Sequence, residues 1–373
     1  MEVINRIIQP DLKNIEQLRI TNYKKTALDN GVPLYIVDGV EEDLVRIELR
    51  FPAGRWYETI KGHSHAVAAL MKKGTATKSS LQIAEAIEFY GAQVETSSGI
   101  DTTSVTLFIL GKHLNTVLPI ISEILNEAIF PEDEIVLYKE RKKQRLRINS
   151  QNTDFHANRK FNEVLFGNKH PYGYAMDEND IDAITREQVV KLYKENYSPG
   201  NAQIFVSGNV PEKIITTLNR EFGNYPHQKI PVAATDKSIY TNEESEFYIQ
   251  RKDSVQSSVR IGCISISKHH PDFPELNVLN TIFGGYFGSR LMSNIRENKG
   301  YTYGIHSYIT HLKHASYFAV DTEVGNEVCK NAIAEVYKEM DVLKSIHIDA
   351  EELNVVKNYM LGTLLRATDG PFN

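Results

Sequence analysis

The sequence has few cysteines, no excess of basic residues and no long apolar run, and each shortage argues against a class of protein. Only Cys263 and Cys329 are present among 373 residues, far apart and outside any Cys-x-x-Cys spacing. Neither a disulfide scaffold nor a cysteine-based zinc site is therefore indicated. The formal net charge is −6, which argues against a nucleic-acid partner because no basic excess is available to neutralise phosphates.

The shortage of apolar runs bears on location. No stretch is long enough to span a bilayer, and the N-terminal residues have scattered charges and no apolar signal-peptide core. We therefore predict no membrane partner and a cytoplasmic location, in keeping with the low cysteine content. The composition, 41% hydrophobic and 24% charged, is that of an ordinary globular protein, and the length fits two domains.

One stretch, Gly62–Thr75, carries a concentrated set of helix signals. Ser64 is a good N-cap residue, Ala66–Met71 is a run of strong helix formers, and Gly74 suits the position after a helix. We predict a short buried helix capped by Ser64.

Alternating and helical patterns recur around this stretch and predict an α+β fold. Strands are predicted at 33–37, 44–51, 93–99, 103–110 and 201–206, and helices at 79–91, 117–125, 131–147 and 185–193. Strands that alternate with helices and are mostly joined by hairpins favour an antiparallel sheet with helices on one face.

The pattern restarts in the second half of the chain. Residues 258–266 match 44–51 at an offset of 214, Gly300 matches Gly91 at 209, and residues 349–366 match 131–147 at about 218. Three echoes in the same order indicate duplicated halves.

These echoes set the expected domain boundaries. Residues 1–223 form the first domain, the Pro-, Asn- and Asp-containing stretch 224–246 is the linker, and 247–373 form the second domain. Since the first half runs on to a strand near 204, we expect the second half to lack its last helix and strand.

The helix with its Lys-Gly-Thr exit resembles the metal-binding helix of the pitrilysin/insulinase (M16) metallopeptidases, whose zinc motif is His-x-x-Glu-His. In that register His65 is the first histidine, while Ala68 and Ala69 replace the general base and the second histidine. The third ligand of the family, a glutamate seven residues after a Glu-Arg pair, falls on Arg147 when counted from Glu140. The resemblance therefore implies a degenerate motif and no metal in this chain.

A second stretch, from Phe283 to Tyr303, resembles the C-terminal M16 signature, a Gly-rich loop followed by Ser-Arg-Leu and Arg-Glu. In that family an arginine and a tyrosine seven residues later reach the substrate backbone and the oxyanion at the zinc, and Arg296 and Tyr303 have this spacing. The glycines at 284, 285 and 288 lack a nucleotide-binding spacing, so we expect a close backbone approach to substrate or to a neighbouring strand.

The resemblance implies two related M16-type (LuxS/MPP-like) α+β domains around a peptide-binding chamber. Arg296 and Tyr303 would then act in trans on zinc held by a zinc-bearing M16 subunit. A homo-dimer of this chain is the other partner that the resemblance allows. A stand-alone peptide-binding or scaffold protein and an active zinc peptidase with unconventional ligands are the alternatives. The basic run Lys139–Arg147 is either a solvated helix face or a basic chamber wall.

Overall fold

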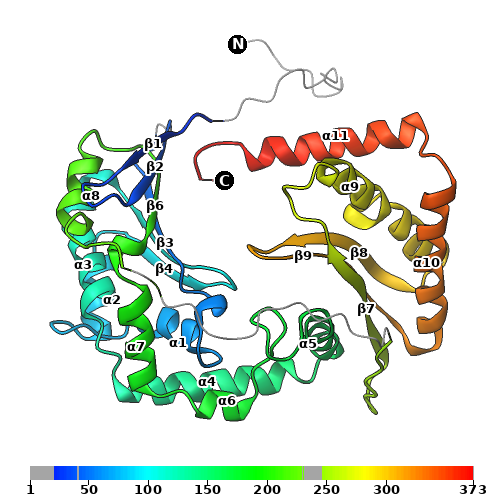
Figure 1. Cartoon of the computed structure of the whole chain (residues 1–373), viewed down its shortest axis with the longest axis horizontal. Helices are drawn as coiled ribbons and strands as arrows, with labels where there is room; N and C mark the ends of the chain where they lie inside the picture. Colours follow the sequence, from blue (N-terminus) through cyan, green and yellow to red (C-terminus); the bar gives the residue numbers. More distant parts are fainter. Residues whose placement is uncertain (1–20, 40–41, 229, 231–245, 373) are drawn as a thin grey trace, which may run out of the picture.

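The computed structural model describes residues 21–39, 42–228, 230 and 246–372, which form two halves, each with a sheet flanked by helices (Figure 1). The first sheet has the strand order β1-β2-β6-β3-β5-β4. Its strands are β1 (Lys24–Ala27), β2 (Pro33–Asp38), β3 (Val45–Phe51), β4 (Gln93–Ser98), β5 (Thr103–Ile109) and β6 (Gln203–Gly208). Neighbours run antiparallel except β2 and β6, which run parallel. The late strand β6 thus separates β2 from β3, although those two are consecutive in the chain.

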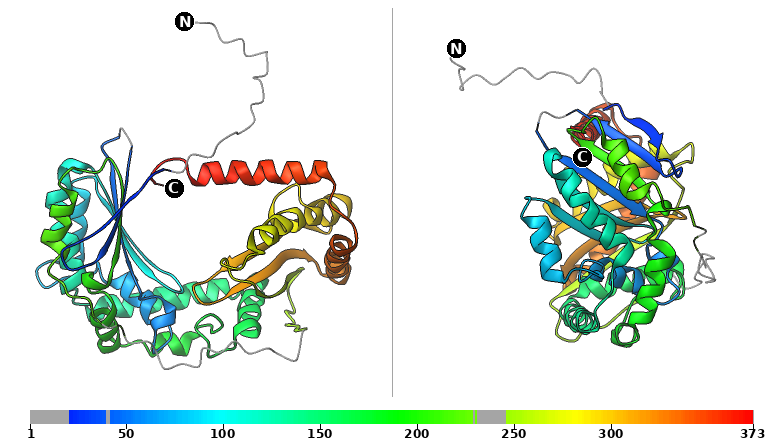
Figure 2. Two further views of the ribbon diagram at one scale, coloured as in Figure 1. Left: turned by 45° about the horizontal axis from the view of Figure 1, so that its top comes forward. Right: turned by 90° about the vertical axis from the view of Figure 1, so that its left-hand side faces the viewer.

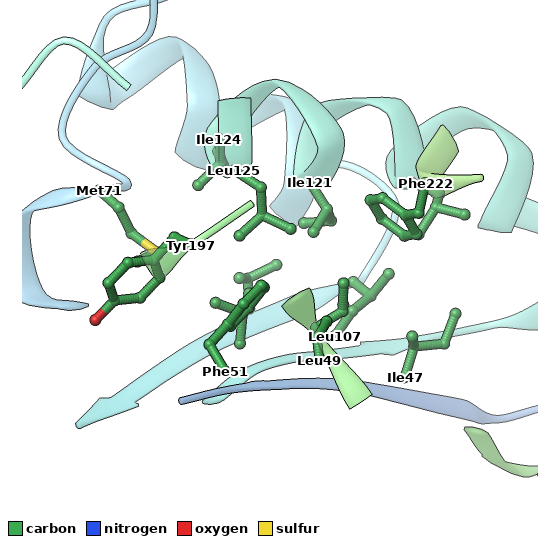
Figure 3. Close-up of a cluster of buried hydrophobic side chains, with 14 of the residues drawn as sticks. Ile47, Leu49, Phe51, Met71, Leu107, Ile121, Ile124, Leu125, Tyr197 and Phe222 are labelled. Carbon is green, nitrogen blue, oxygen red and sulfur yellow. The ribbon is translucent and has the colours of Figure 1, made fainter. Parts of the chain in front are cut away.

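Helices cover the outer face of this sheet (Figure 1). They include α2 (Ser80–Glu88), α3 (Leu114–Glu127), α7 (Arg186–Asn196) and α8 (Ile214–Phe222). Because side chains alternate along a strand, Ile47, Leu49 and Phe51 of β3 point together into the helix layer, and all three are buried. Figure 3 shows them facing Ile121 and Phe222 across the main core.

Four further helices of the first half lie beside or below this layer (Figure 1). They are α1 (His63–Leu70), α4 (Glu132–Asn149), α5 (Thr153–Phe166) and α6 (Glu178–Asp182). The sequence patterns did not predict α5. Its only fully buried apolar residue is Phe166, because α5 packs on β7 of the second half and not into the first core.

The second half repeats part of the first with fewer strands. Its sheet has the order β7-β9-β8, all antiparallel. The elements are β7 (Gln256–Ser265), β8 (Thr302–His311), β9 (Ser316–Gly325), α9 (Phe273–Asn280), α10 (Cys329–Ser345) and α11 (Ala350–Ala367). Its core is much smaller than that of the first half and includes Phe283, Ile295, Ile305 and Val320.

The predicted duplication is confirmed by three matched features. The order β3-β5-β4 corresponds to β7-β9-β8. Gly91 and Gly300 each precede the matching hairpin with left-handed φ values of 63° and 65°, a conformation that favours glycine. The helices α4 and α11 each have 18 residues. The prediction of two α+β halves is therefore confirmed, with the parallel β2–β6 pair as its one departure from an antiparallel sheet.

The two halves lie on opposite sides of the molecule, joined at one end by α4 and α5 and approached at the other by α11 (Figures 1 and 2). Arg260 of β7 ion-pairs with Asp154 of α5 and with Asp321 of β9. At the other end, the Arg46 guanidinium donates to the Phe372 carbonyl over 3.3 Å. Polar contacts therefore link the halves at both ends.

Two further sequence predictions concern the linker and membrane spans. Most of the predicted linker 224–246 lies outside the described residues, so its boundaries stay a prediction. Within the described ranges, every helix is too short or too polar to cross a bilayer.

Candidate functional site

The helix α1 starts two residues earlier than predicted, and the carboxylate that caps it comes from outside the helix. Gly62 is the N-cap, with a left-handed φ of 85°, and Ser64 lies within the first turn. The Gly62 and Ser64 N–H groups donate to the two Glu58 carboxylate oxygens over 2.9 and 2.7 Å. The hydroxyls of Ser64 and Tyr174 donate to the same carboxylate. The prediction of a Ser64 cap is thus wrong because a buried glutamate satisfies the free N–H groups of this terminus.

The exit of α1 is fixed by a second carboxylate. The hydroxyls of Thr75 and Thr77 and the Lys78 ammonium all donate to Glu123 of α3. Partial burial alone would raise the pKa of Glu123, but these donors hold it near 2. The Gly-Thr exit of the motif is therefore a structural anchor.

The positions aligned with the zinc motif lie on this firmly held helix. Ala68 is buried and Ala69 is half-buried, so the two side chains are methyl groups with no donor to offer. His65 hydrogen-bonds through Nδ1 to the Tyr138 hydroxyl of α4 over 2.9 Å. His63 lies elsewhere, with its ring nitrogens 2.9 Å from the Ile60 carbonyl and 3.1 Å from Gln188 Oε1.

Arg147 does not lie with His65. It donates two hydrogen bonds to Glu178 of α6, over 2.7 and 2.6 Å. Residues 138, 142 and 145 are spaced i, i+4 and i+7 and so share one helix face, whereas 147 lies on the opposite face. The side chains of α4 that share the face of Tyr138 are therefore Lys142 and Arg145. Arg147, the position aligned with the third ligand of the family, points toward α6.

The electrostatics around His65 are positive. Desolvation by its neighbours and then the charges of Lys142 and Arg145 lower the pKa of His65 to about 4. Burial, followed by the charges of Arg145 and Arg55, lowers the pKa of Lys142. Burial and then the Glu58 charge raise the pKa of Tyr138, so its phenol stays protonated.

These residues do not fit a zinc ion. A catalytic zinc site needs three protein ligands, and only one imidazole stands here, facing ammonium and guanidinium groups that repel a cation. Within the described ranges, no cluster of three or more His, Cys, Asp or Glu side chains could hold a metal.

The second motif packs into the core of the second half, where Phe283, Met292 and Ile295 are buried. Gly284 approaches β8 so closely that a Cβ would lie 2.6 Å from Ser307 Oγ. The expected close backbone approach is therefore to a neighbouring strand. Arg296 lies in the π-helical segment Met292–Asn298, and its guanidinium stacks over the Phe287 ring at 4.6 Å.

Tyr303 lies in a register shift of β8 between Thr302 and Ile305, a kind of irregularity that re-aims side chains. It is 91% exposed and lines an open cleft of about 1410 Å³. The cleft has walls from both halves, including Asp154 of α5 and Arg260 of β7. In the described part of the chain, neither Arg296 nor Tyr303 has a side-chain hydrogen bond or ion pair, so both donors are available to a ligand.

Comparison with known proteins identifies the class. Residues 37–176 match the family described as insulinase (peptidase family M16), and residues 183–360 match the one described as the peptidase M16 inactive domain. The chain belongs to the M16 family, as a member without the His-x-x-Glu-His motif.

Relatives of this chain carry similar descriptions. An uncharacterized zinc protease of Bacillus subtilis, YmxG, is 24% identical over 346 residues, covering 92% of this chain and 83% of that protein. Two crystal structures share the fold. The peptidase M16 inactive domain from Pseudomonas fluorescens has a TM-score of 0.79 at 24% identity, covering 92% of this chain and 84% of its own. A protease from Helicobacter pylori has a TM-score of 0.83 at 18% identity, and the match covers 94% of this chain and 86% of that protease.

Proposed function

We propose that this chain is the non-catalytic subunit of a heteromeric M16 metalloendopeptidase and supplies Arg296 and Tyr303 to peptide held at the zinc site of another subunit. One contrast carries the proposal. The motif that would hold zinc is replaced by methyl groups and cations, while the two donors of the second motif are kept. Within the described residues, neither donor has a side-chain hydrogen bond or ion pair, although Arg296 stacks on Phe287.

The chemistry of the two side chains suits that role. A guanidinium and a phenol both donate hydrogen bonds, and donors aimed at a carbonyl oxygen stabilise the negative charge that develops on it during peptide hydrolysis. A peptide can approach Tyr303 along the open cleft. We place the complex in the cytoplasm, with peptide as substrate.

The test uses a zinc-bearing M16 protein from the same organism, one with an intact His-x-x-Glu-His motif, as the partner. Arg296→Ala or Tyr303→Phe is mixed with that partner, assembly is confirmed by sizing, and peptide cleavage is measured. Each variant should lower turnover on the order of 10²–10³-fold, the range for losing one donor to an oxyanion. Tyr337→Phe, a half-exposed tyrosine of α10, is the control and should leave turnover unchanged. Full activity of both variants in intact complexes would reject the role in trans.

A stand-alone peptide-binding or scaffold protein is the second candidate. The lost ligands favour it as much as they favour the heteromer, and a neighbouring reading frame with a His-x-x-Glu-His protein distinguishes the two. If the partner is a second copy, neither copy supplies zinc and the scaffold remains.

A further inference from the structure

The face of α4 that is turned toward α1 carries cations that have no ion-pair partner among the described residues. Lys142 and Arg145 lie one and two turns beyond Tyr138, whose hydroxyl bonds to His65. A third cation, Arg55, stands nearby, and its guanidinium donates to the Tyr174 carbonyl over 3.3 Å and lies 4.6 Å from the Tyr174 ring. Within the described residues, none of these cations has a carboxylate in ion-pair range.

The carboxylate near these cations, that of Glu58, already accepts hydrogen bonds from other groups. Glu58 accepts the N–H groups of Gly62 and Ser64 and the hydroxyls of Ser64 and Tyr174. It therefore caps α1 and does not pair directly with Lys142 or Arg145.

The opposite face of the same helix gives an internal comparison. Lys143 pairs with Asp182 over 2.8 Å, and Arg147 pairs with Glu178 in two hydrogen bonds. On one helix, then, the outward cations are neutralised by α6 and the cations beside the degenerate motif are not.

Lys142 and Arg55 are half-buried and Arg145 is exposed. Cations without an ion-pair partner attract an anion, and a guanidinium matches a carboxylate with two parallel hydrogen bonds. We propose that the degenerate zinc site has become a carboxylate-binding site, in which Arg145, Lys142 and Arg55 hold an acidic group of a bound peptide. The Tyr138 hydroxyl, which stays protonated, is a further donor to the same group. This inference rests on the proposed function insofar as the ligand is a peptide.

The experiment compares three fluorescent peptides of equal length with the full chain. The first has one central Glu and an amidated C-terminus, the second has Gln in its place, and the third has the Gln and a free C-terminal carboxylate. Binding is followed by anisotropy at about 0.1 M salt, because higher salt screens the contact. At least one carboxylate peptide should bind about tenfold tighter than the neutral peptide, since ionised partners make the stronger hydrogen bonds. The first and third peptides distinguish a side-chain carboxylate from a C-terminal one.

Variants locate the effect. Lys142→Ala with Arg145→Ala should reduce the preference to near unity, whereas Arg147→Ala, which removes a charge from the opposite face, should keep it. Equal affinity for the three peptides overturns the carboxylate site and leaves peptide binding intact. An equal loss of preference in the Arg147→Ala variant also overturns the carboxylate site, because the preference would then come from the total positive charge of α4 and not from Lys142 and Arg145. If no peptide binds to the chain, either alone or in complex with its partner, the proposed function is rejected and this carboxylate site with it.

Discussion

The two motif-bearing regions of this chain differ in what they keep: the first has lost its metal-binding residues, and the second has kept its two hydrogen-bond donors. In the first half, the helix α1 is held at both ends by carboxylates, Glu58 and Glu123, yet alanines replace the general base and the second histidine of the zinc motif. In the second half, Arg296 and Tyr303 stay accessible at the edge of a small core. The difference teaches that the scaffold of a metal helix can persist without its ligands, because its stability comes from capping and packing and not from the ion.

The largest expected effect is the gain of a metal site in the first half. Ala68→Glu and Ala69→His supply the base and the second histidine, and Arg145→Glu adds a carboxylate on the face of α4 that meets His65. This triple variant should bind zinc at least about tenfold tighter than a triple with Arg147→Glu, since loss of even an outer partner costs that much. Competition with a chromogenic chelator measures both affinities.

Any single one of these changes should leave the chain without measurable zinc, because ligands act as a set. Equal affinity of the two triple variants would mean that position 145 does not face the site.

The second effect tests whether Glu58 holds the scaffold. Glu58→Ala leaves two N–H groups and two hydroxyls without their buried acceptor, so the free energy of unfolding should fall by about 2–4 kcal/mol. Urea unfolding measures the change. Glu85→Ala on the exposed face of α2 is the matched control, expected within about 0.5 kcal/mol of the parent. Equal stability of the two variants would exclude Glu58 as the cap.

A smaller effect concerns the pH response of His65. Its pKa of about 4 in the folded chain lies below the ordinary value of 6.5, so the unfolded chain takes up the proton first. The contribution of His65 therefore lowers the free energy of unfolding as the pH falls from 6.5 to 4. Lys142→Ala with Arg145→Ala should raise the pKa and weaken this loss, although desolvation still holds the pKa below 6.5.

Histidine NMR titration reads this pKa directly. Arg147→Ala, with its cation on the far face, should leave the His65 titration in place. A shift of equal size in that variant would contradict the proximity of Lys142 and Arg145.

The sequence predicted the duplicated halves because their signals are local. Alternation predicted β3, and Thr185 caps α7 as its spacing with Gln188 indicated. The position of β6 between β2 and β3 was not predictable, because it depends on pairing across more than 150 residues. Glu58 was missed for a related reason, since it caps α1 from outside the positions where cap signals are read.

The face of a helix is also hard to assign from a motif alone. Counting from Glu140 placed Arg147 at the degenerate site, and a shift of two residues on a helix turns a side chain by about 200°. The hydrogen bond between Tyr138 and His65 fixes which face meets α1. With that one contact, the spacing of i, i+4 and i+7 would have identified Lys142 and Arg145.

The most direct measurement determines zinc and peptide cleavage on the same samples, namely this chain alone, a zinc-bearing M16 partner alone, and the two together. The account predicts no stoichiometric zinc and no hydrolysis for the chain alone, and chelator-sensitive cleavage by the mixture that exceeds the partner's own by on the order of 10²-fold or more. One tightly held zinc per chain, with cleavage by the chain alone, would contradict it.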